Sequence, residues 1–344
     1  MKAMTPIVTI IIPTYNRHRQ LKRLLDYYSN INFPIIVGDS TATAFPNSSR
    51  YKNVKYLHFP DYTYAKKLPL IYKKVKTKYV LFCADDDFII PNAISNSVKF
   101  LEKNRTYVSA HGHYVFFESN GRMNIKVYPF YLHSIDIDIN SDKPSERVKQ
   151  LLSNYMQLLY AVTKTSVVKE VFQQLEKNPG IKNDSLVELF QAIMVCINGK
   201  SKTLPIFYCA REVTPNSART YIAALDVVST NKKYSKEYNL WLKVILNYLL
   251  KKEGMPKAKA QNKLLEAIKL YLKDELLTLS FLNIYTLQLQ RIVNKYSFGM
   301  AQKIYRFIIP SPDKENLKKH AFTKKGSETE FKKISYFIEK YSAV

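Results

Sequence analysis

Three adjacent carboxylates, Asp85, Asp86 and Asp87, are the residues whose type and spacing most directly suggest chemistry. They follow Tyr79–Ala84, an apolar run typical of a strand buried on both faces. Neighbouring carboxylates repel one another, so the triplet needs a cation or hydrogen-bond donors beside it. In an extended chain alternate residues point the same way, so Asp85 and Asp87 are expected to face one ion while Asp86 turns aside. Their hard oxygen atoms suit Mg²⁺ or Mn²⁺.

Two further polar clusters follow apolar runs near the N-terminus. The run 7–12 leads into Pro13–Arg17, and the run 34–38 leads into Asp39–Thr41. In an open parallel α/β sheet, ligands bind beyond the carboxyl ends of the strands, so the three clusters are expected to meet at one edge. An isolated acidic triplet is most simply a solvated turn, and an isolated βα loop is most simply a helix cap. The convergence of all three therefore favours a binding site.

The order of the expected elements supports such a sheet. Apolar and helical patterns follow one another as strand, helix, strand, strand, helix, strand, which is typical of an open, mostly parallel α/β sheet flanked by helices. Asn16 is expected to cap the first helix, and Asp184 or Ser185 the last one before Gly199. Strands are predicted at 7–12, 34–39, 54–59, 79–84, 108–118 and 204–211, and helices at 17–30, 68–75, 91–104, 145–160, 166–177 and 184–198.

The length of 344 residues suggests two domains, or one large domain with an appendage. A boundary is predicted near Ser229–Tyr234, which separates an α/β part, residues 1–229, from residues 230–344. Beyond it, Leu, Lys and Tyr recur at helical spacing, including over residues 275–295, and strand-like alternation disappears. The C-terminal part is therefore predicted to be a basic α-helical domain or appendage.

The chain carries 53 Lys and Arg against 28 Asp and Glu, a net charge of +25 that attracts polyanions. The basic C-terminal helices present either a solvated Lys-rich face or a surface for anionic lipid. No basic run lies in a recognisable nucleic-acid-binding fold, so no nucleic-acid partner is expected. Cys83, Cys196 and Cys209 lie in apolar runs without a CxxC pair, which indicates reduced core residues of a cytoplasmic protein. The sequence shows no signal peptide or spanning segment, so any membrane contact is expected to be peripheral, on the inner face.

The three polar motifs together resemble those of the family 2-type GT-A glycosyltransferases. VTIIIPTYNR at Val8–Arg17, IIVGDST at Ile35–Thr41 and KYVLFCADDD at Lys78–Asp87 carry the likeness. It is specific over about residues 5–100, loose to about residue 215 and absent afterwards. The resemblance implies a GT-A, Rossmann-like sheet and a Mg²⁺- or Mn²⁺-dependent, inverting transfer of a sugar. The implied donor is a nucleoside-diphosphate sugar, and the implied acceptor is a hydroxyl of a cell-surface glycan or lipid-linked intermediate.

The resemblance also implies roles for individual residues. Asp85 and Asp87 would lie around the metal. An Arg-Asn pair that the family often carries before the acidic triplet would fall at Leu68 and Pro69 and is missing, so Lys66 or Lys67 is expected to substitute for it. Gly38 replaces the first Asp of the second motif. The residues implied to bind the nucleotide sugar are Pro13, Thr14, Tyr15, Arg17, Asp39, Lys67, Asp85, Asp86 and Arg211.

A single-displacement enzyme needs a carboxylate that takes the proton of the acceptor hydroxyl. In the family this base opens a helix about a dozen residues before a Gly. Counting back from Gly199 favours Glu188, whereas the position at the helix start favours Asp184, and Glu188 is slightly preferred. The simpler interpretations are an N-cap for Asp184 and a solvated first-turn acid for Glu188.

Several features stay open. Arg211 or Arg219 could close over the diphosphate, with Val213–Tyr221 as a mobile flap, although a surface ion pair of Arg211 is the simpler explanation. His111 and His113 share one face of a strand and are most simply ordinary sheet residues. One alternative function is a nucleotidyltransferase of similar fold, which normally has a Gly-rich phosphate loop that Pro13–Arg17 lacks. Another is a non-catalytic basic module that binds nucleic acid or membrane, whose affinity would fall steeply with salt.

Overall fold

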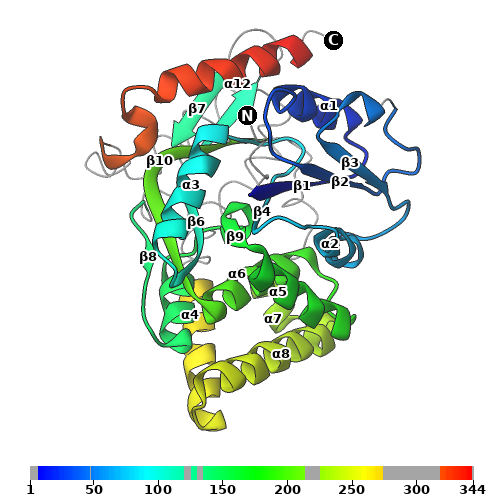
Figure 1. The fold of residues 1–344 in the computed structure, drawn as a ribbon. Helices are drawn as coiled ribbons and strands as arrows, with labels where there is room; N and C mark the ends of the chain where they lie inside the picture. Colours follow the sequence, from blue (N-terminus) through cyan, green and yellow to red (C-terminus); the bar gives the residue numbers. More distant parts are fainter. Residues whose placement is uncertain are drawn as a thin grey trace, which may run out of the picture.

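The computed structural model describes residues 7–46, 48–119, 125–129, 135–213, 225–273 and 318–342. Its centre is a ten-stranded sheet. The strands are β1 Val8–Thr14, β2 Ile35–Asp39, β3 Val54–His58, β4 Tyr79–Phe82, β5 Phe88–Ile89, β6 Tyr107–Ser119, β7 Ile125–Pro129, β8 Asp138–Ile139, β9 Val162–Lys164 and β10 Lys200–Glu212. Their order is β3-β2-β1-β4-β9-β6-β10-β5, with β7 beside β6 and β8 beside β10 (Figure 1).

Most of the main strands run parallel. The neighbours β3, β2, β1 and β4 are parallel to one another, and β6 is parallel to β10. The short strand β9 lies antiparallel between β4 and β6. Every residue of β1 is buried, as its continuous apolar run predicts for a strand covered on both faces. The prediction of a mostly parallel open sheet is confirmed.

Helices cover both faces of this sheet. Figure 1 shows α1 and α12 on one side of β1 and β2, and α2, α5 and α6 on the other. The chain from residue 257 to residue 273 is also helical. The labelled helices are α1 His18–Tyr27, α2 Tyr64–Lys73, α3 Pro91–Lys103, α4 Pro144–Ser153, α5 Thr165–Lys177, α6 Asp184–Asn198, α7 Leu225–Thr230, α8 Ser235–Glu253 and α12 Ser327–Ser342.

The predicted starts of α1 and α2 are wrong, and both helices begin next to loops at the edge of the sheet. Asn16 does not cap α1, because its backbone has a φ of 54° and its N–H donates to Thr41 Oγ1 at 2.9 Å. The helix begins instead after Arg17. Helix α2 starts at Tyr64, four residues earlier than predicted, because Thr63 caps it through its side chain. The earlier start brings Lys67 into the second turn of α2.

The predicted helix at 145–160 ends early. Helix α4 stops at Ser153, and the chain then leaves the helix through Asn154–Gln157 before a short 3₁₀ turn at Leu158–Tyr160. Side-chain hydrogen bonds tie this stretch to other segments: the hydroxyls of Tyr155 and Tyr160 donate to Glu188 and Asp87, and Gln157 accepts from Arg211. Tertiary contacts therefore override the helical periodicity of this stretch.

Two of the described C-terminal helices pack on helices that cover the sheet, at two separate places. Helix α8 packs on α6, where Trp241 Nε1 donates to the Leu186 carbonyl at 3.0 Å. Helix α12 lies beside α1 at the opposite end of the molecule, and Tyr341 contacts Asp26 and Lys22 there (Figure 1). Buried residues of both helices belong to the same hydrophobic core as β1. The predicted boundary at residues 229/230 therefore does not separate two cores within the described ranges, and the helix expected at 275–295 lies outside them.

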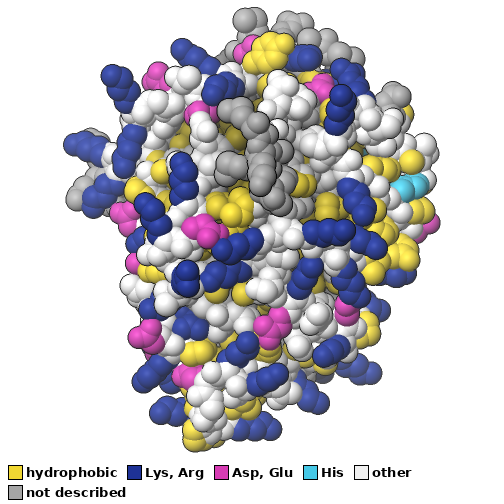
Figure 2. All heavy atoms as spheres, viewed as in Figure 1, with side chains coloured by type: hydrophobic (Ala, Val, Ile, Leu, Met, Phe, Trp, Pro, Cys, Tyr) yellow, Lys and Arg dark blue, Asp and Glu magenta, His cyan; other side chains and the backbone are white. Residues whose placement is uncertain are grey.

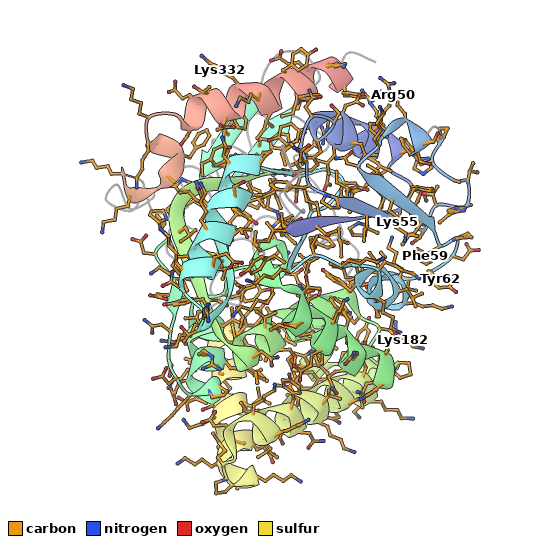
Figure 3. The ribbon with its side chains drawn as sticks, in the orientation of Figure 1. Arg50, Lys55, Phe59, Tyr62, Lys182 and Lys332 are labelled. Atoms are coloured by element: carbon orange, nitrogen blue, oxygen red, sulfur yellow. The ribbon has the colours of Figure 1, made fainter. Side chains whose placement is uncertain are left out.

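Basic side chains are prominent on the face of the molecule shown in Figure 2, and one lysine lies on an edge strand of the sheet. Figure 2 shows Lys and Arg side chains spread over the visible face, with fewer Asp and Glu between them. Strand β3 forms one edge of the sheet, and the exposed Lys55 lies on it, on the same side of the molecule as Phe59 and Tyr62 (Figure 3). A charged side chain on an edge strand discourages pairing with another chain. Among the helices of the described ranges, none combines the length and apolarity needed to cross a membrane.

Candidate functional site

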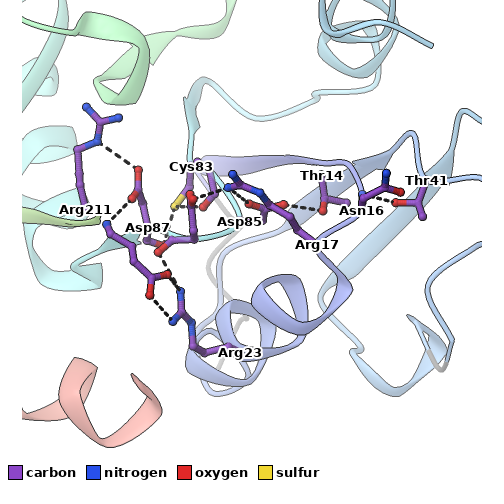
Figure 4. Close-up of polar contacts among 12 residues, drawn as sticks. Thr14, Asn16, Arg17, Arg23, Thr41, Cys83, Asp85, Asp87 and Arg211 are labelled. Atoms are coloured by element: carbon purple, nitrogen blue, oxygen red, sulfur yellow. Dashed lines mark hydrogen bonds and ion pairs between the residues drawn. The ribbon is translucent and has the colours of Figure 1, made fainter. Parts of the chain in front are cut away.

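The acidic triplet forms a buried turn between β4 and β5. The N–H of Asp87 donates to the Ala84 carbonyl at 3.2 Å, and all three carboxylates are almost inaccessible to solvent. Because the chain turns here, the expected alternation of side chains is wrong: Asp85 and Asp86 both contact Arg17, whereas Asp87 faces β10 (Figure 4). The two carboxylates predicted to share one ion therefore have different protein partners.

Asp85 joins the ends of β1 and β4. Its Oδ2 accepts a hydrogen bond from Thr14 Oγ1 at 2.6 Å, and its Oδ1 lies 3.5 Å from Arg17 Nη1 (Figure 4). Burial raises the pKa of Asp85 above its ordinary value, and the neighbouring charge of Asp86 raises it further. The structure therefore brings the first and third polar clusters together, as the parallel strand order predicted.

Asp87 is held from the other side of the site. Arg211 Nε lies 3.2 Å from Asp87 Oδ2, the Glu212 N–H donates to Asp87 Oδ1 at 2.9 Å, and the hydroxyl of Tyr160 also donates to Oδ2. Gln157 in turn accepts a hydrogen bond from Arg211. Burial raises the pKa of Asp87, and the guanidinium of Arg211 opposes that rise. Arg211 is thus a partner of the acidic turn rather than a residue of a surface ion pair.

Arg23 and Glu212 complete the surroundings of the turn, and neither was predicted to bind the donor. Arg23 Nη2 donates to Glu212 Oε2 at 2.6 Å and to the Asp86 carbonyl at 3.0 Å. Arg23 is one of the buried residues of α1, and the others are leucines. Helical spacing places Arg23 away from the face that carries Leu21, Leu24 and Leu25, so its burial could not be predicted from the sequence pattern.

The end of β2 contributes Asp39. Its carboxylate accepts hydrogen bonds from the Thr41 N–H at 2.8 Å and from the Tyr56 hydroxyl at 2.6 Å, and it lies 2.7 Å from His18 Nε2. Burial acts to raise the pKa of Asp39, but these hydrogen bonds outweigh it, and the pKa lies below its ordinary value. Asp39 is fully buried. A nucleobase could therefore reach it only by displacing one of these partners.

Beside this cluster, Tyr15 is the accessible aromatic residue of the first motif. Tyr15 is 61% exposed where the chain leaves β1, whereas Pro13 and Thr14 are buried within the strand. An exposed aromatic ring at a strand end can stack on a planar base. Tyr15 is thus an accessible aromatic residue of this motif that can meet a nucleoside directly.

Lys67 lies between the three strand ends. Its Nζ donates to the Thr14 carbonyl at 2.8 Å. Burial lowers the pKa of Lys67 to about 8, although the charges of Asp39, Asp85 and Asp184 oppose this. The structure therefore places Lys67 among the site residues, where the missing Arg-Asn pair was expected to need a substitute.

The two candidate bases differ in their surroundings. Asn183 caps α6, since its Oδ1 accepts from the Leu186 N–H at 3.1 Å, so the N-cap interpretation of Asp184 is wrong. Asp184 occupies the first turn, and burial raises its pKa to about 6 against the opposing charge of Lys67. Glu188 lies one turn further along, where the Tyr155 hydroxyl donates to it at 3.0 Å. Asp184 is thus the acid whose charge is coupled to the site lysine.

Other predicted features fall outside the site. His111 and His113 are buried in β6, and their rings bond to the backbone carbonyls of Gly112 and Ile135, which makes them ordinary sheet residues. Arg219 and all of the proposed flap except Val213 lie outside the described residues. Within the part of the chain that the structure describes, no group of three or more His, Cys, Asp or Glu side chains is arranged to hold a metal ion.

Comparisons with known proteins agree with this architecture. Residues 9–152 match the family model described as glycosyl transferase family 2. The S. aureus TarS 1–349 structure solved with UDP-GlcNAc shares the fold, with a TM-score of 0.54 and 14% identity over 83% of this chain and 78% of that chain. A second TarS structure gives a TM-score of 0.49 and 15% identity, covering 78% of this chain and 43% of that chain. No curated protein matches.

The family match covers all three polar motifs and continues into α4. The structural likeness extends beyond the family match, since it covers 83% of this chain. Both findings confirm the resemblance that the motifs predicted. The chain therefore matches glycosyl transferase family 2 over residues 9–152, a part of its length, and it is identified as a glycosyltransferase with the GT-A fold.

Proposed function

We propose that the chain transfers a sugar from a nucleoside-diphosphate sugar to an acceptor hydroxyl by a metal-dependent single displacement. The observation that carries the proposal is the meeting of the buried Asp85–Asp87 turn with Arg17, Lys67 and Arg211 at the carboxyl ends of the strands. A diphosphate is the ligand that needs both cationic groups and a carboxylate-bound cation. The S. aureus TarS structure was solved with UDP-GlcNAc, which makes UDP-sugars the first donors to test.

Mg²⁺ or Mn²⁺ fits the oxygen atoms that the turn offers. Asp87 would hold the cation, because Mg²⁺ can take a single carboxylate and complete its shell with substrate phosphates and water. Asp85 would serve as a second ligand only after leaving Thr14 and Arg17, which hold it in this structure. The raised pKa of both carboxyls supports this assignment, since a buried carboxylate is stabilised by a nearby cation. When bound, such an ion supplies Lewis-acid stabilisation of the leaving diphosphate.

The side chains of the chain itself perform the remaining tasks. The exposed ring of Tyr15 stacks on the base, and Thr14 orients Asp85 beneath it. Arg17 and Arg211 offset the negative charge that grows on the diphosphate as the sugar–phosphate bond breaks. Asp184 takes the proton of the acceptor hydroxyl while that oxygen attacks the anomeric carbon. One displacement of this kind inverts the anomeric configuration.

We assign the base to Asp184 rather than Glu188 on their contacts. Asp184 lies close enough to Lys67 for each charge to shift the pKa of the other group, whereas Glu188 is hydrogen-bonded to Tyr155. A pKa of about 6 leaves Asp184 largely ionised at neutral pH and still basic enough to accept a proton. The slight preference that the count from Gly199 gave to Glu188 is therefore reversed in this proposal.

We further propose that the acceptor is a cell-surface glycan or lipid-linked intermediate, met from the cytoplasmic side of an anionic membrane. The net charge of +25 supports attraction to such a surface. The three free, buried cysteines fit a reducing compartment. Co-sedimentation with vesicles that contain anionic lipid, but not with neutral vesicles, tests this part, and equal recovery from both would contradict it.

The donor reaction can be tested without knowing the acceptor. Release of nucleoside diphosphate is measured from UDP-, GDP- and dTDP-sugars with Mn²⁺, Mg²⁺ or a chelator, for the wild type, Asp87→Asn and the control Asp142→Asn. Asp142 is an exposed acid outside the site, so its variant is expected to match the wild type. Loss of release with the chelator and in Asp87→Asn supports the proposal. If no donor is hydrolysed and no donor with Mn²⁺ raises Tm, the proposal fails.

A further inference from the structure

A buried ion pair between Arg23 and Glu212 lies directly behind the acidic turn. Two guanidinium nitrogens of Arg23 reach the two carboxylate oxygens of Glu212, at 2.6 and 3.3 Å. The side chains are only 7% and 14% exposed, and the guanidinium lies 5.0 Å from the centre of the Phe88 ring. Helix α1 and the end of β10 are thereby joined across the turn (Figure 4).

Both partners also contact the turn itself. Arg23 Nη2 donates to the Asp86 carbonyl at 3.0 Å, and the N–H of Glu212 donates to Asp87 Oδ1 at 2.9 Å. Arg23, Glu212 and the two aspartates thus form a closed ring of hydrogen bonds. Arg23 holds the backbone carbonyl of Asp86 and Glu212 holds the carboxylate of Asp87, so the ion pair between them fixes the position of one group relative to the other.

The same helix holds the turn from two sides. Arg17, just before α1, contacts the carboxylates of Asp85 and Asp86, while Arg23 contacts the backbone of Asp86. Strand β10 likewise contributes two adjacent residues, since Arg211 contacts the carboxylate of Asp87 and Glu212 contacts it through the backbone. The ion pair between Arg23 and Glu212 joins these two holding elements directly through their side chains.

Stability alone does not account for such a pair. Removing two charges from water costs free energy that their attraction often fails to recover, and apolar residues of similar volume stabilise a protein equally well. The planar fork of arginine, by contrast, fixes direction, because its donors can meet a carboxylate and a carbonyl at once. The pair is therefore suited to setting geometry.

We propose that Arg23 and Glu212 are positioning residues for the transfer reaction: their ion pair sets the conformation in which Asp86 and Asp87 meet the donor. Neither side chain needs to touch the substrate. This inference rests on the proposed function, because it concerns the turn to which the donor and its cation are assigned. The proposal predicts that loss of the Arg23–Glu212 ion pair weakens donor binding even in a variant that folds normally.

The test compares single and double replacements by methionine. Arg23→Met leaves a buried, unpaired carboxylate and is expected to lower Tm, and Glu212→Met leaves an unpaired guanidinium. The double variant Arg23→Met/Glu212→Met leaves neither charge unpaired and keeps the backbone N–H of residue 212, so its Tm is expected to return to the wild-type range. Its kcat/KM for donor hydrolysis is expected to stay about 10–100-fold low, with a raised donor KM.

A second arginine offers a matched control. Arg147 is as buried as Arg23 and donates to the carbonyls of Ser141, Cys196 and Ile197, away from the site. Arg147→Met is expected to lower Tm while the folded fraction keeps wild-type kcat/KM. This variant shows what loss of a purely structural arginine does to the assay.

Each outcome decides the inference. A double variant with wild-type Tm and wild-type kcat/KM would overturn it. If the double variant does not fold, Arg23→Lys decides, because a single ammonium keeps the charge but cannot reproduce the fork. A raised donor KM in Arg23→Lys at wild-type Tm supports positioning, and an unchanged KM rejects it. A wild type that hydrolyses no donor rejects the proposed function instead, and the inference with it.

Discussion

The ammonium group of Lys67 donates a hydrogen bond to the Thr14 carbonyl at 2.8 Å, which joins helix α2 to the end of the central strand. Lys67 is 3% exposed, and burial lowers its pKa to about 8 despite the negative charges of Asp39, Asp85 and Asp184. A cation that loses its proton at only slightly alkaline pH therefore lies at the centre of the candidate site. Asp184 carries the opposite charge near Lys67, and burial raises the pKa of Asp184 to about 6.

These two groups predict a bell-shaped pH dependence of kcat/KM for the donor. Below about pH 6, Asp184 becomes protonated and cannot accept the proton of the hydroxyl. Above about pH 8, Lys67 loses the charge that favours the diphosphate. The measurement is kcat/KM between pH 5 and 9.5, because this ratio reports the ionisations of the free enzyme.

The variant Lys67→Arg identifies the group behind the alkaline limb. Arginine stays protonated throughout this range, so the limb should move above pH 9 while the acidic limb stays in place. An alkaline limb that does not move in this variant would show that another group controls it. In either case, the acidic limb of the kcat/KM profile, below pH 7, still reports the ionisation of Asp184.

Gly38 illustrates a different constraint, a lack of space. A Cβ at this position would lie 2.1 Å from Ile71 Cδ1 and 3.0 Å from its Cγ1, so α2 packs directly on the backbone of β2. Gly38→Ala is expected to lower the free energy of unfolding by about 1–3 kcal/mol through overpacking. Chemical denaturation with urea measures the change.

The companion variant Ile71→Val removes the methyl group that would clash. Gly38→Ala/Ile71→Val should recover part of the lost stability, whereas Ile71→Val alone should cost about 0.5–1.5 kcal/mol. Additive losses in the double variant would contradict the packing explanation. The same contact explains why this chain has glycine where the resembling family has the first Asp of its second motif.

The sheet and the convergence of polar clusters could be predicted because they depend on local patterns. Continuous β-branched runs such as Ile10–Ile12 indicate a doubly covered strand, and parallel strands place their carboxyl ends at one edge. The contact between Thr14 and Asp85 follows from that order. The three motifs also predicted the resemblance to the family 2-type glycosyltransferases, and the family model matches the chain over residues 9–152.

Features set by tertiary partners could not be predicted. The turn at Asp85–Asp87 splits side chains that an extended chain would align, and the early end of α4 depends on hydrogen bonds from Tyr155 and Tyr160 to distant segments. The pairing of Arg23 with Glu212 joins residues 189 positions apart. No local periodicity encodes such a distance, and helical spacing places Arg23 away from the leucine face of α1.

The hydroxyl of Tyr160 is a further testable contact of the acidic turn. Tyr160→Phe removes one of three donors to Asp87 and keeps the buried ring, so stability should fall by only about 1 kcal/mol. Donor affinity should fall several-fold, because the carboxylate loses part of its orientation. Calorimetric titration of nucleoside diphosphate with Mn²⁺ measures this.

Tyr208 provides the matched control for this variant. Its hydroxyl is equally buried and donates to the Tyr160 carbonyl at 2.7 Å, but it does not contact the triplet. Tyr208→Phe should lower stability by a similar amount and leave the Kd unchanged. Equal losses of affinity in both variants would indicate a general loosening of the fold rather than a specific effect on Asp87.

The identity of the base gives the last prediction, because activity and stability should change in opposite directions. Asp184→Asn cannot accept a proton, so turnover should fall by about 10²–10³-fold while donor affinity stays within twofold. The folded pKa of Asp184, about 6, lies above the unfolded value of 3.8. The stability that its protonated form contributes is therefore present below about pH 4 and lost as pH rises through 6. At pH 7 the variant is expected to have a higher Tm than the wild type.

Glu188→Gln distinguishes the alternative. Glutamine keeps an oxygen that accepts the hydrogen bond of Tyr155, so turnover should change less than threefold. Steady-state rates with donor alone and thermal unfolding at pH 7 are measured for both variants. If Glu188→Gln loses turnover and Asp184→Asn keeps it, the count from Gly199 identifies the base after all, and the raised pKa of Asp184 reflects only its burial beside Lys67.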